Sequence, residues 1–264
     1  MKRLIITADD FGLCHEVNQA VARAYQQGVL TCASLMVSGE SFDEAAAIAR
    51  ENPKLGVGLH LVLVEGRSVL TPDEIPDLVD RQGRFSNNLW QAGTRYFFKR
   101  GIRDQIRREC EAQIQKFETI GVTFDHLNAH NHFHLHPTVA SIVVALARKY
   151  EIPAMRVPYA PFFGPLTWSL KKRLRMSGVL YNDALFGLEE SGRFDEATWL
   201  QALDSLPEGV TEMYTHPATA KSPILNATMP DYCHAEELEA LLSPRVRDKI
   251  EALQIETTSY QLLG

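Results

Sequence analysis

Apolar runs with the length of strands alternate with segments of helical period along most of this 264-residue chain. This alternation is typical of parallel sheets, because parallel strands need a crossover connection and a helix usually provides it. Strands are expected at residues 3–8, 30–37, 55–63, 123–128, 152–157, 210–214 and 255–257. About seven strand–helix units in a single domain, 1–264, favour an irregular (β/α) barrel with its active site at the carboxyl ends of the strands.

Ordinary helix signals separate these strands. A helix over residues 15–27 is expected to end at Gly28, because glycine readily ends helices. Ser41 with Glu44 three residues later has the pattern of a capping box at the start of the next helix. Two longer connections are interpreted as insertions in the barrel, at about 64–100 and 158–194.

Charge and cysteine content bound the class of protein. A formal net charge of -6 provides no excess of Lys and Arg for neutralising phosphates, which excludes nucleic acid as a general partner. The four cysteines are scattered without a C-x-x-C pair, as is usual for reduced thiols. No apolar stretch approaches the roughly 18 residues of a spanning helix, and the first residues lack a signal-peptide core. We expect a cytoplasmic protein that contacts a membrane only peripherally, on its inner face.

Two adjacent carboxylates, Asp9 and Asp10, follow the first apolar run. Ionised carboxylates are costly to bury unless they are paired, hydrogen-bonded or bound to a metal. The pair therefore indicates a cation beside a core strand. The alternative is a simple turn before Gly12, in which an aspartate accepts backbone hydrogen bonds.

The carboxyl ends of parallel strands gather at one rim, where the active sites of such folds form. The predicted strands bring to this rim Asp9, Asp10, His60, His130, Arg156 and His216. An acid from the first strand and imidazoles from the third and fourth would make a three-ligand metal site with open positions for water or substrate. These donors suit zinc, manganese, cobalt, nickel or iron, whereas magnesium prefers oxygen ligands.

Five of the nine histidines lie within residues 126–136. Alternate residues of an extended chain share a face, so these side chains could point the same way; they are His126, His130, His132, His134 and His136. A metal needs only one or two of them. The alternatives are a pH-sensitive surface patch or helix caps, for which His136 before Pro137 is a candidate.

Four motifs in this order resemble the YdjC-type carbohydrate deacetylases over essentially the whole chain. They are Thr7–Gly12, Gly58–Leu61, His126–His130 with the trailing His132 and His134, and His216–Pro217. The segments 60–67 and 132–137 are similar to the subgroup associated with hopanoid biosynthesis.

The resemblance implies a divalent ion held by Asp10, His60 and His130, with Asp9 as general base and His216 as general acid. Zinc or magnesium is expected, with manganese, cobalt and nickel as alternatives. Many relatives carry Asp where this chain has Asn128, so Asn128 is expected only to orient a neighbour. The residues expected to orient or bind substrate are Asn128, His132, His134 and Arg156, and a structural salt bridge is the alternative for Arg156.

The implied reaction removes the N-acetyl group from an N-acetylglucosamine-type sugar, giving acetate and a free amino sugar. The expected substrate is the N-acetylglucosaminyl headgroup of a hopanoid lipid, and soluble chitooligosaccharides are the alternative. A metal-dependent phosphoesterase could use the same ligands, although the chain has no G-x-x-x-x-G-K motif. A non-enzymatic metal-binding or metal-sensing protein is a further alternative.

Residues 158–181 combine basic and apolar side chains and contain no acidic residue. The apolar ones include Phe162, Trp168, Leu170, Leu174 and Met176, and the basic ones Lys171, Lys172, Arg173 and Arg175. An apolar face with a basic flank is typical of a segment lying on an anionic bilayer, and residues 90–100 have a similar character. A lid, a helix packed on the barrel or a homodimer contact are the alternatives.

Overall fold

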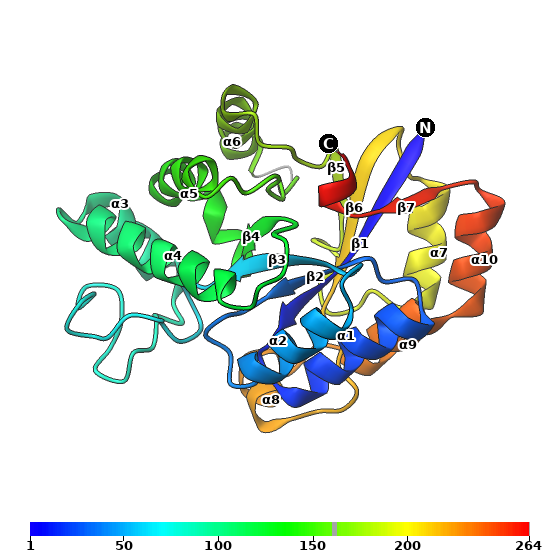
Figure 1. Ribbon diagram of the computed structural model, residues 1–264, viewed down its shortest axis with the longest axis horizontal. Helices are drawn as coiled ribbons and strands as arrows, with labels where there is room; N and C mark the ends of the chain where they lie inside the picture. The colour runs from blue at the N-terminus through cyan, green and yellow to red at the C-terminus, as the bar shows by residue number, and fades with distance from the viewer. Residues whose placement is uncertain (160–162, 264) are drawn as a thin grey trace.

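The computed structural model of the protein describes residues 1–159 and 163–263. Phe162 and Gly264, which belong to the predicted membrane segment and the predicted domain, therefore lie outside the described residues. The strands are β1 (Lys2–Phe11), β2 (Cys32–Leu35), β3 (Gly56–Leu61), β4 (Leu127–Ala129), β5 (Ala184–Phe186), β6 (Gly209–Thr215) and β7 (Glu256–Thr258). They pair in the order β4-β3-β2-β1-β6-β5, β7 adds to β1, and every pair is parallel. The curled parallel sheet of an irregular barrel is confirmed (Figure 1).

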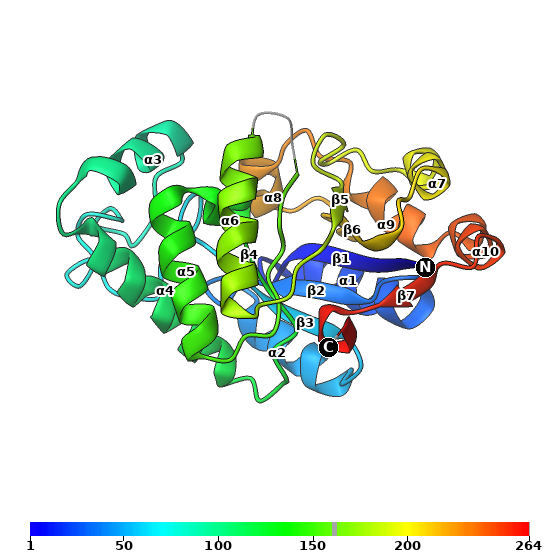
Figure 2. The same cartoon turned by 90° about the horizontal axis from the view of Figure 1, so that it is seen from above.

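Helices surround this sheet, as the view from above shows (Figure 2). They are α1 (His15–Gln27), α2 (Phe42–Glu51), α3 (Leu89–Phe98), α4 (Ile102–Glu118), α5 (Pro137–Lys149), α6 (Gly164–Ser177), α7 (Glu196–Asp204), α8 (Pro223–Thr228), α9 (His234–Leu242) and α10 (Pro244–Ala252). Two 3-10 helices, η1 (His130–Leu135) and η3 (Tyr260–Leu263), complete the elements used below. None of the helices in the described ranges has the length and apolar character needed to span a bilayer.

The predicted strand over residues 152–157 is present only as isolated bridges. Met155 pairs with Leu127 of β4, and Ala154 pairs with Leu180. Further along, the carboxamide of Asn182 replaces the regular ladder, because it accepts from the Val157 backbone N–H and donates to the Val157 carbonyl. The segment thus continues the sheet from β4 toward the chain that leads into β5. The segment 158–194, interpreted as an insertion, carries β5 itself.

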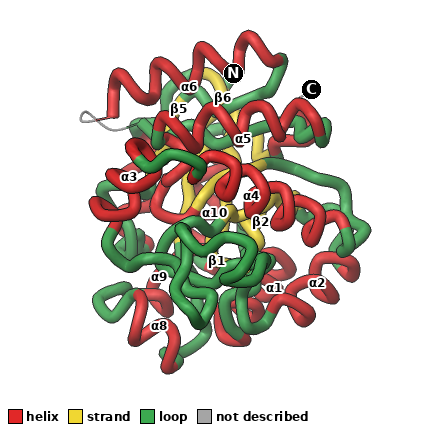
Figure 3. The backbone as a smooth tube through the Cα atoms, turned by 90° about the vertical axis from the view of Figure 1, so that its left-hand side faces the viewer, coloured by secondary structure: helices red, strands yellow, loops and turns green. Residues whose placement is uncertain are grey.

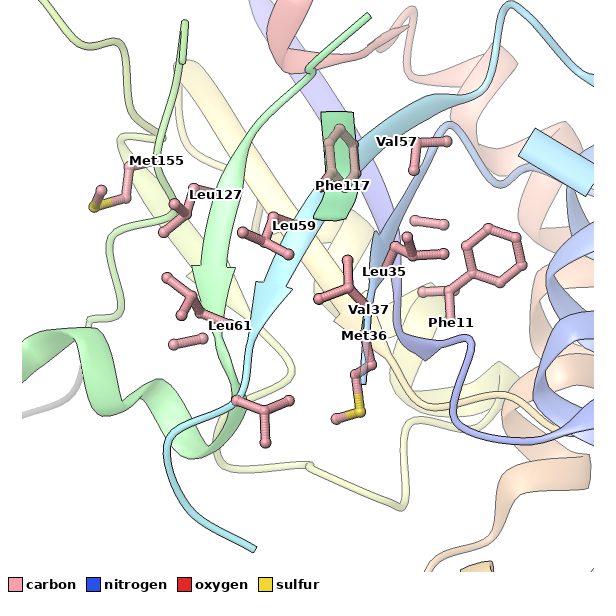
Figure 4. Packing of buried hydrophobic residues seen from close by; sticks show 14 of the residues in the cluster. Phe11, Leu35, Met36, Val37, Val57, Leu59, Leu61, Phe117, Leu127 and Met155 are labelled. Carbon is pink, nitrogen blue, oxygen red and sulfur yellow. The ribbon is translucent and has the colours of Figure 1, made fainter. Parts of the chain in front are cut away.

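The core lies between the strands and the covering helices. Leu59, Leu61 and Leu127 are fully buried and pack beside one another, with Phe117 of α4 against them (Figure 4). Parallel strands that are covered on both faces read as continuous apolar runs, which is why β1 to β3 were visible in the sequence. A polar residue inside such a run is therefore a departure that needs a partner.

Two local predictions were wrong. The capping box is not formed: Ser41 precedes α2, but its hydroxyl makes no capping bond within the described residues, and Glu44 instead accepts hydrogen bonds from Asn18 and Gln19 on α1. The histidine segment is not extended, because it forms η1, in which Asn131 and His132 have positive φ of 52°. The five histidines therefore do not share one face.

The two N-cap residues Ser41 and Asp195 provide a test of this capping. Asp195 accepts a hydrogen bond from the Thr198 backbone N–H at 2.9 Å. We expect Asp195→Ala to lower the free energy of unfolding by about 1 kcal/mol and Ser41→Ala by less than about 0.5 kcal/mol. Urea unfolding of both variants measures the difference. Equal losses at the two positions would contradict the observed caps.

Candidate active site

Asp9 and Asp10 lie near the carboxyl end of β1. Figure 3 shows the strands at the centre of the molecule, with helices and loops around them. Adjacent side chains of a regular strand point to opposite faces. Here the register of β1 against β2 shifts between Ala8 and Phe11, and Asp10 has a positive φ of 63°. Such bulges and positive φ values re-aim side chains and are common beside functional sites. They allow both carboxylates to take part in one buried site.

Three donor atoms from three elements meet beside Asp10. His60 Nε2, near the end of β3, and His130 Nδ1, directly after β4, each lie 3.3 Å from Asp10 Oδ1. The two imidazole nitrogens are 3.4 Å apart. Asp10 is 1% exposed, and neither of its carboxylate oxygens has a hydrogen-bond partner in the described part of the chain. A buried carboxylate without partners is costly, so these residues fit a bound cation.

The size of this donor triangle is informative. An equilateral triangle with edges near 3.3 Å is one face of a tetrahedron whose centre lies about 2.0 Å from each corner, which is the usual distance from zinc to imidazole or carboxylate donors. The predicted ligand set Asp10, His60 and His130 is therefore brought together with spacing suited to a small divalent ion. One corner of the tetrahedron is left for water or substrate.

Asn128 of β4 orients His60. Its Oδ1 lies 2.7 Å from His60 Nδ1, and its Nδ2 donates to Ser34 Oγ at 2.8 Å and to Asp9 Oδ1 at 3.2 Å. His60 Nδ1 is therefore the donating nitrogen, and Nε2 keeps its lone pair toward Asp10. A hydrogen bond on the far nitrogen of a ligand histidine is the usual way in which proteins fix its tautomer.

Asp9 has the opposite environment to Asp10. Arg156 Nη1 donates to Asp9 Oδ2 at 2.5 Å and Nη2 to Oδ1 at 2.9 Å, and the same guanidinium binds Glu212 of β6 with Nε and Nη2 at 2.9 and 2.8 Å. Burial alone would raise the pKa of Asp9, but the guanidinium outweighs it and holds this pKa well below its usual value. Asp9 is ionised at every pH at which the protein would work.

The charges of this site do not balance by themselves. Asp9, Asp10 and Glu212 are all buried, and when the imidazoles are neutral, as metal ligands are, the single positive charge of Arg156 leaves two negative charges on these three carboxylates. Burial raises the pKa of Asp10, but contacts with His130 and His60 outweigh it, so this pKa is also well below the usual value. One divalent cation beside Asp10 would neutralise the set.

His216 follows β6 and lies between aromatic rings. Its ring centroid is 5.6 Å from that of Tyr214 and 5.2 Å from that of Tyr232. Its backbone N–H donates to Glu237 Oε2, and burial raises the pKa of Glu237 to about 7. Nδ1 of His216 has no partner among the residues described, and burial lowers the pKa of the ring.

The remaining histidines of residues 126–136 divide between different roles. His132 Nε2 lies 3.0 Å from the Tyr214 hydroxyl, and His134 Nε2 donates to the Arg156 carbonyl at 3.0 Å. Both rings therefore position the neighbours of Asp9. His136 occupies the N-cap position of α5, as predicted, and its side chain reaches the Gly93 carbonyl at 3.0 Å. His126 lies deeper, behind the rim.

Sequence reasoning missed several residues of the site. Glu212 and Tyr260 complete the surroundings of Arg156, since the Tyr260 hydroxyl donates to Glu212 Oε2 at 2.6 Å. Glu65, which follows β3 with a positive φ of 51°, lies 3.8 Å from His130 Nε2. Glu212 lies within the predicted strand 210–214, and this position was a usable signal, because an ionised carboxylate is as costly to bury there as at Asp9 and Asp10.

A cleft of about 430 Å³ opens beside Glu65. Its walls combine apolar and charged groups, among them Leu13, Met36, Val62, Arg67, Arg84 and Ile224. Apolar walls with a few polar groups are typical of small-ligand sites. Glu65, whose carboxylate lies 3.8 Å from His130 Nε2, is the lining residue that connects the cleft to the donor triangle.

Comparison with known proteins places this chain in a family. The sequence profile of YdjC-like proteins matches residues 3–252. A carbohydrate deacetylase from Brevibacillus brevis is 31% identical over 99% of this chain and 100% of its own length. A chitooligosaccharide deacetylase from Serratia marcescens is 31% identical over 94% of each chain.

A solved structure has the same fold. It is that of a protein from Enterococcus faecalis V583 with the provisional description of a cellobiose-phosphate cleavage protein. Its TM-score is 0.85 at 28% sequence identity, and the match covers 100% of this chain and 99% of the other. The whole barrel, including the irregular side, is thus shared.

His134 makes the stability of the protein depend on pH. Burial, followed by the nearby Arg156 charge, lowers its pKa from 6.5 to about 3. Below pH 6.5 the unfolded chain takes up a proton that the folded protein refuses, so this contribution to stability is present above pH 6.5 and is lost as the pH falls. We expect the free energy of unfolding to drop by about 2 kcal/mol more between pH 7 and pH 5 in the wild type than in His134→Gln. Urea unfolding at both pH values measures it, and parallel losses would contradict the buried neutral His134.

Proposed function

Because the chain belongs to the family of YdjC-like proteins, we propose that it is a metal-dependent carbohydrate N-deacetylase. It would remove the N-acetyl group from an N-acetylglucosamine-type sugar and release acetate and a free amine. The observation that carries the proposal is the buried carboxylate of Asp10 between His60 and His130, whose oxygens have no hydrogen-bond partner among the described residues, with a second, differently held carboxylate next to it. The deacetylase names of relatives that match along nearly the whole chain support the reaction type.

Asp10, His60 and His130 would hold one divalent ion, and zinc suits these mixed nitrogen and oxygen donors better than magnesium. When bound, such an ion lowers the pKa of water and polarises a carbonyl group. Asn128 keeps His60 Nε2 in its unprotonated form, which is the form that binds a metal.

Asp9 would act as the base. A carboxylate offers about four acceptor positions. Arg156 uses two of them and Asn128 one, which leaves one for a water molecule. Because Asp9 is always ionised, it can orient that water and take its proton as the water attacks the acetamide carbon.

His216 would protonate the departing amine. Its Nδ1 has no competing partner within the described ranges, and its backbone is fixed by Glu237 and by His234 Nδ1, which lies 2.5 Å from the His216 carbonyl. The lowered pKa makes its protonated form a stronger acid toward an amine.

Replacing the two aspartates one at a time should have different effects. We expect Asp10→Asn to lose the metal, whereas Asp9→Asn keeps it and loses about 10²-fold or more in turnover. Metal analysis and acetate release from an N-acetylglucosamine oligomer measure the two effects, with the exposed Asp73→Asn as a control. Full activity of Asp9→Asn would refute the base, and release of phosphate from phosphoesters without acetate from any acetamido sugar would favour the phosphoesterase.

We also propose that the acetylated sugar is carried on a lipid, such as a hopanoid headgroup. Support comes from α3 and α6, which both pack on α5 at one end of the molecule (Figure 1). Neither helix contains an acidic residue. Trp90 of α3 is 88% exposed and Trp168 of α6 is 66% exposed, with Lys172 lying over the Trp168 ring. Exposed aromatic and basic side chains together suit an anionic bilayer surface.

Part of the predicted amphipathic face is used inside the protein. Leu170 and Leu174 of α6 are buried in the core, so the packed-helix alternative holds for them. Trp168 and Met176 remain outside, as do Phe97 and Phe98 of α3. The surface available to a membrane is therefore narrower than the sequence indicated.

Vesicle binding tests this surface. We expect the wild type to co-sediment with vesicles containing anionic lipid, and the double variant Trp90→Gln with Trp168→Gln to lose most of that binding while its activity on a soluble chitooligosaccharide is unchanged. Leu262→Gln, which removes another exposed apolar side chain, is the matched control. If the wild type fails to bind anionic vesicles, the substrate is a soluble sugar.

A further inference from the structure

A line of buried polar side chains extends from His60 into the barrel, away from the rim. Asn128 joins His60 to Ser34 of β2, and Ser34 Oγ lies 2.9 Å from His126 Nε2. His126 Nδ1 then lies 2.8 Å from Asp125 Oδ2. Ser34, Asp125, His126 and Asn128 are all fully buried. The mechanism described above uses only the first member, Asn128.

The directions of these hydrogen bonds are determined from both ends. Asp9 and Asp125 are carboxylates and can only accept, so Asn128 turns Nδ2 toward Asp9 and His126 donates from Nδ1 to Asp125. Asn128 Oδ1 must then accept from His60 Nδ1. Between the two ends, Ser34 accepts from Asn128 and donates to His126 Nε2. Every donor in the line has one acceptor, and a single arrangement satisfies all of them.

Two other functions for this cluster fail on geometry. Ser34, His126 and Asp125 have the contacts of a serine nucleophile triad, but all three are inaccessible and the Ser34 oxygen is already taken by Asn128. Cys32, Asp125 and His126 have the spacing of metal ligands, yet both nitrogens of His126 are engaged in hydrogen bonds. The cluster is therefore satisfied as it stands, unlike Asp10.

The surrounding chain is built around His126. A Cβ atom on Gly58 would lie 2.5 Å from the His126 ring, so only glycine at this position of β3 leaves room for it. The Tyr260 ring covers the other part of the imidazole with centroids 5.1 Å apart. The Gln261 backbone N–H donates to Asp125 Oδ1 at 2.9 Å. The far end of the line is thus fixed by the C-terminal 3-10 helix η3.

We propose that Ser34, His126 and Asp125 are positioning residues for His60. They hold the carboxamide of Asn128 in one orientation, and this orientation keeps His60 Nε2 free to bind the metal ion. The proposal rests on the proposed metal site. Without Ser34, one N–H of Asn128 has no acceptor and only the longer 3.2 Å bond to Asp9 directs Nδ2 away from His60, so the preference of His60 for one tautomer is weakened.

The experiment measures zinc affinity by competition with a chromophoric chelator. We expect Ser34→Ala to bind zinc about tenfold more weakly than the wild type, because losing residues that orient metal ligands through hydrogen bonds usually lowers metal affinity by about this factor or more. Ser243→Ala, which removes a buried serine that caps α10, is the matched control and should leave zinc affinity unchanged. Unchanged zinc affinity in Ser34→Ala would overturn the proposal.

The tautomer of His60 provides a second readout. Nitrogen-15 spectra of the wild-type histidines should show His60 protonated on Nδ1 before and after zinc is added. A wild-type His60 that is protonated on Nε2 would also overturn the proposed positioning role. In Ser34→Ala we expect His60 to show both tautomers before zinc is added. The two proposals can fail separately. A wild type that binds no zinc refutes the metal site itself. Tight zinc binding by both the wild type and Ser34→Ala refutes only the positioning role of Ser34, His126 and Asp125.

Discussion

The buried guanidinium of Arg156 is the interaction on which the rest of the site depends. The guanidinium lies between Asp9 of β1 and Glu212 of β6. The backbone N–H of Arg156 donates to the Leu127 carbonyl of β4 at 3.0 Å. Burying an ion pair costs desolvation that only good geometry and further hydrogen bonds repay. Both conditions are met, because Thr7 and Tyr260 also donate to Glu212. Arg156 therefore connects the irregular segment 152–157 to β1, β4 and β6. Its positive charge also compensates the negative charge of Asp9, so that Asp10 is left for a cation.

The rim could be predicted from the sequence because parallel strands that are covered on both faces appear as apolar runs. Once the ends of those runs were located, Asp10, His60 and His130 fell at one edge. Glu212, Ser34 and Tyr260 could not be placed, since their contacts depend on strand register and on where η3 docks. In the observed register Thr7 lies opposite Tyr214, which brings Glu212 beneath Arg156. The conformation of residues 130–135 could not be predicted from the sequence either, because no pattern of apolar residues indicates the positive φ of Asn131 and His132.

Two neighbouring aspartates thus acquire different chemistry from their surroundings alone. Asp9 accepts hydrogen bonds at all but one of its acceptor positions, whereas neither oxygen of Asp10 accepts one from the residues that the structure describes. The bulge at the end of β1 makes this possible, because it brings two side chains that a regular strand would separate into one site. Behind His60, the polar side chains of Asn128, Ser34, His126 and Asp125 are all hydrogen-bonded to one another, in contrast to Asp10.

Cobalt(II) titration followed by visible absorption tests the metal site most directly, because the spectrum reports the ligand type and the stoichiometry together. We expect saturation at one cobalt per chain, a spectrum typical of nitrogen and oxygen ligands, and loss of this spectrum in Asp10→Asn. A sulfur-to-cobalt charge-transfer band would contradict this metal site, because Asp10, His60 and His130 provide no sulfur ligand, whereas the group of Cys32, Asp125 and His126 does. Absence of binding would contradict it equally.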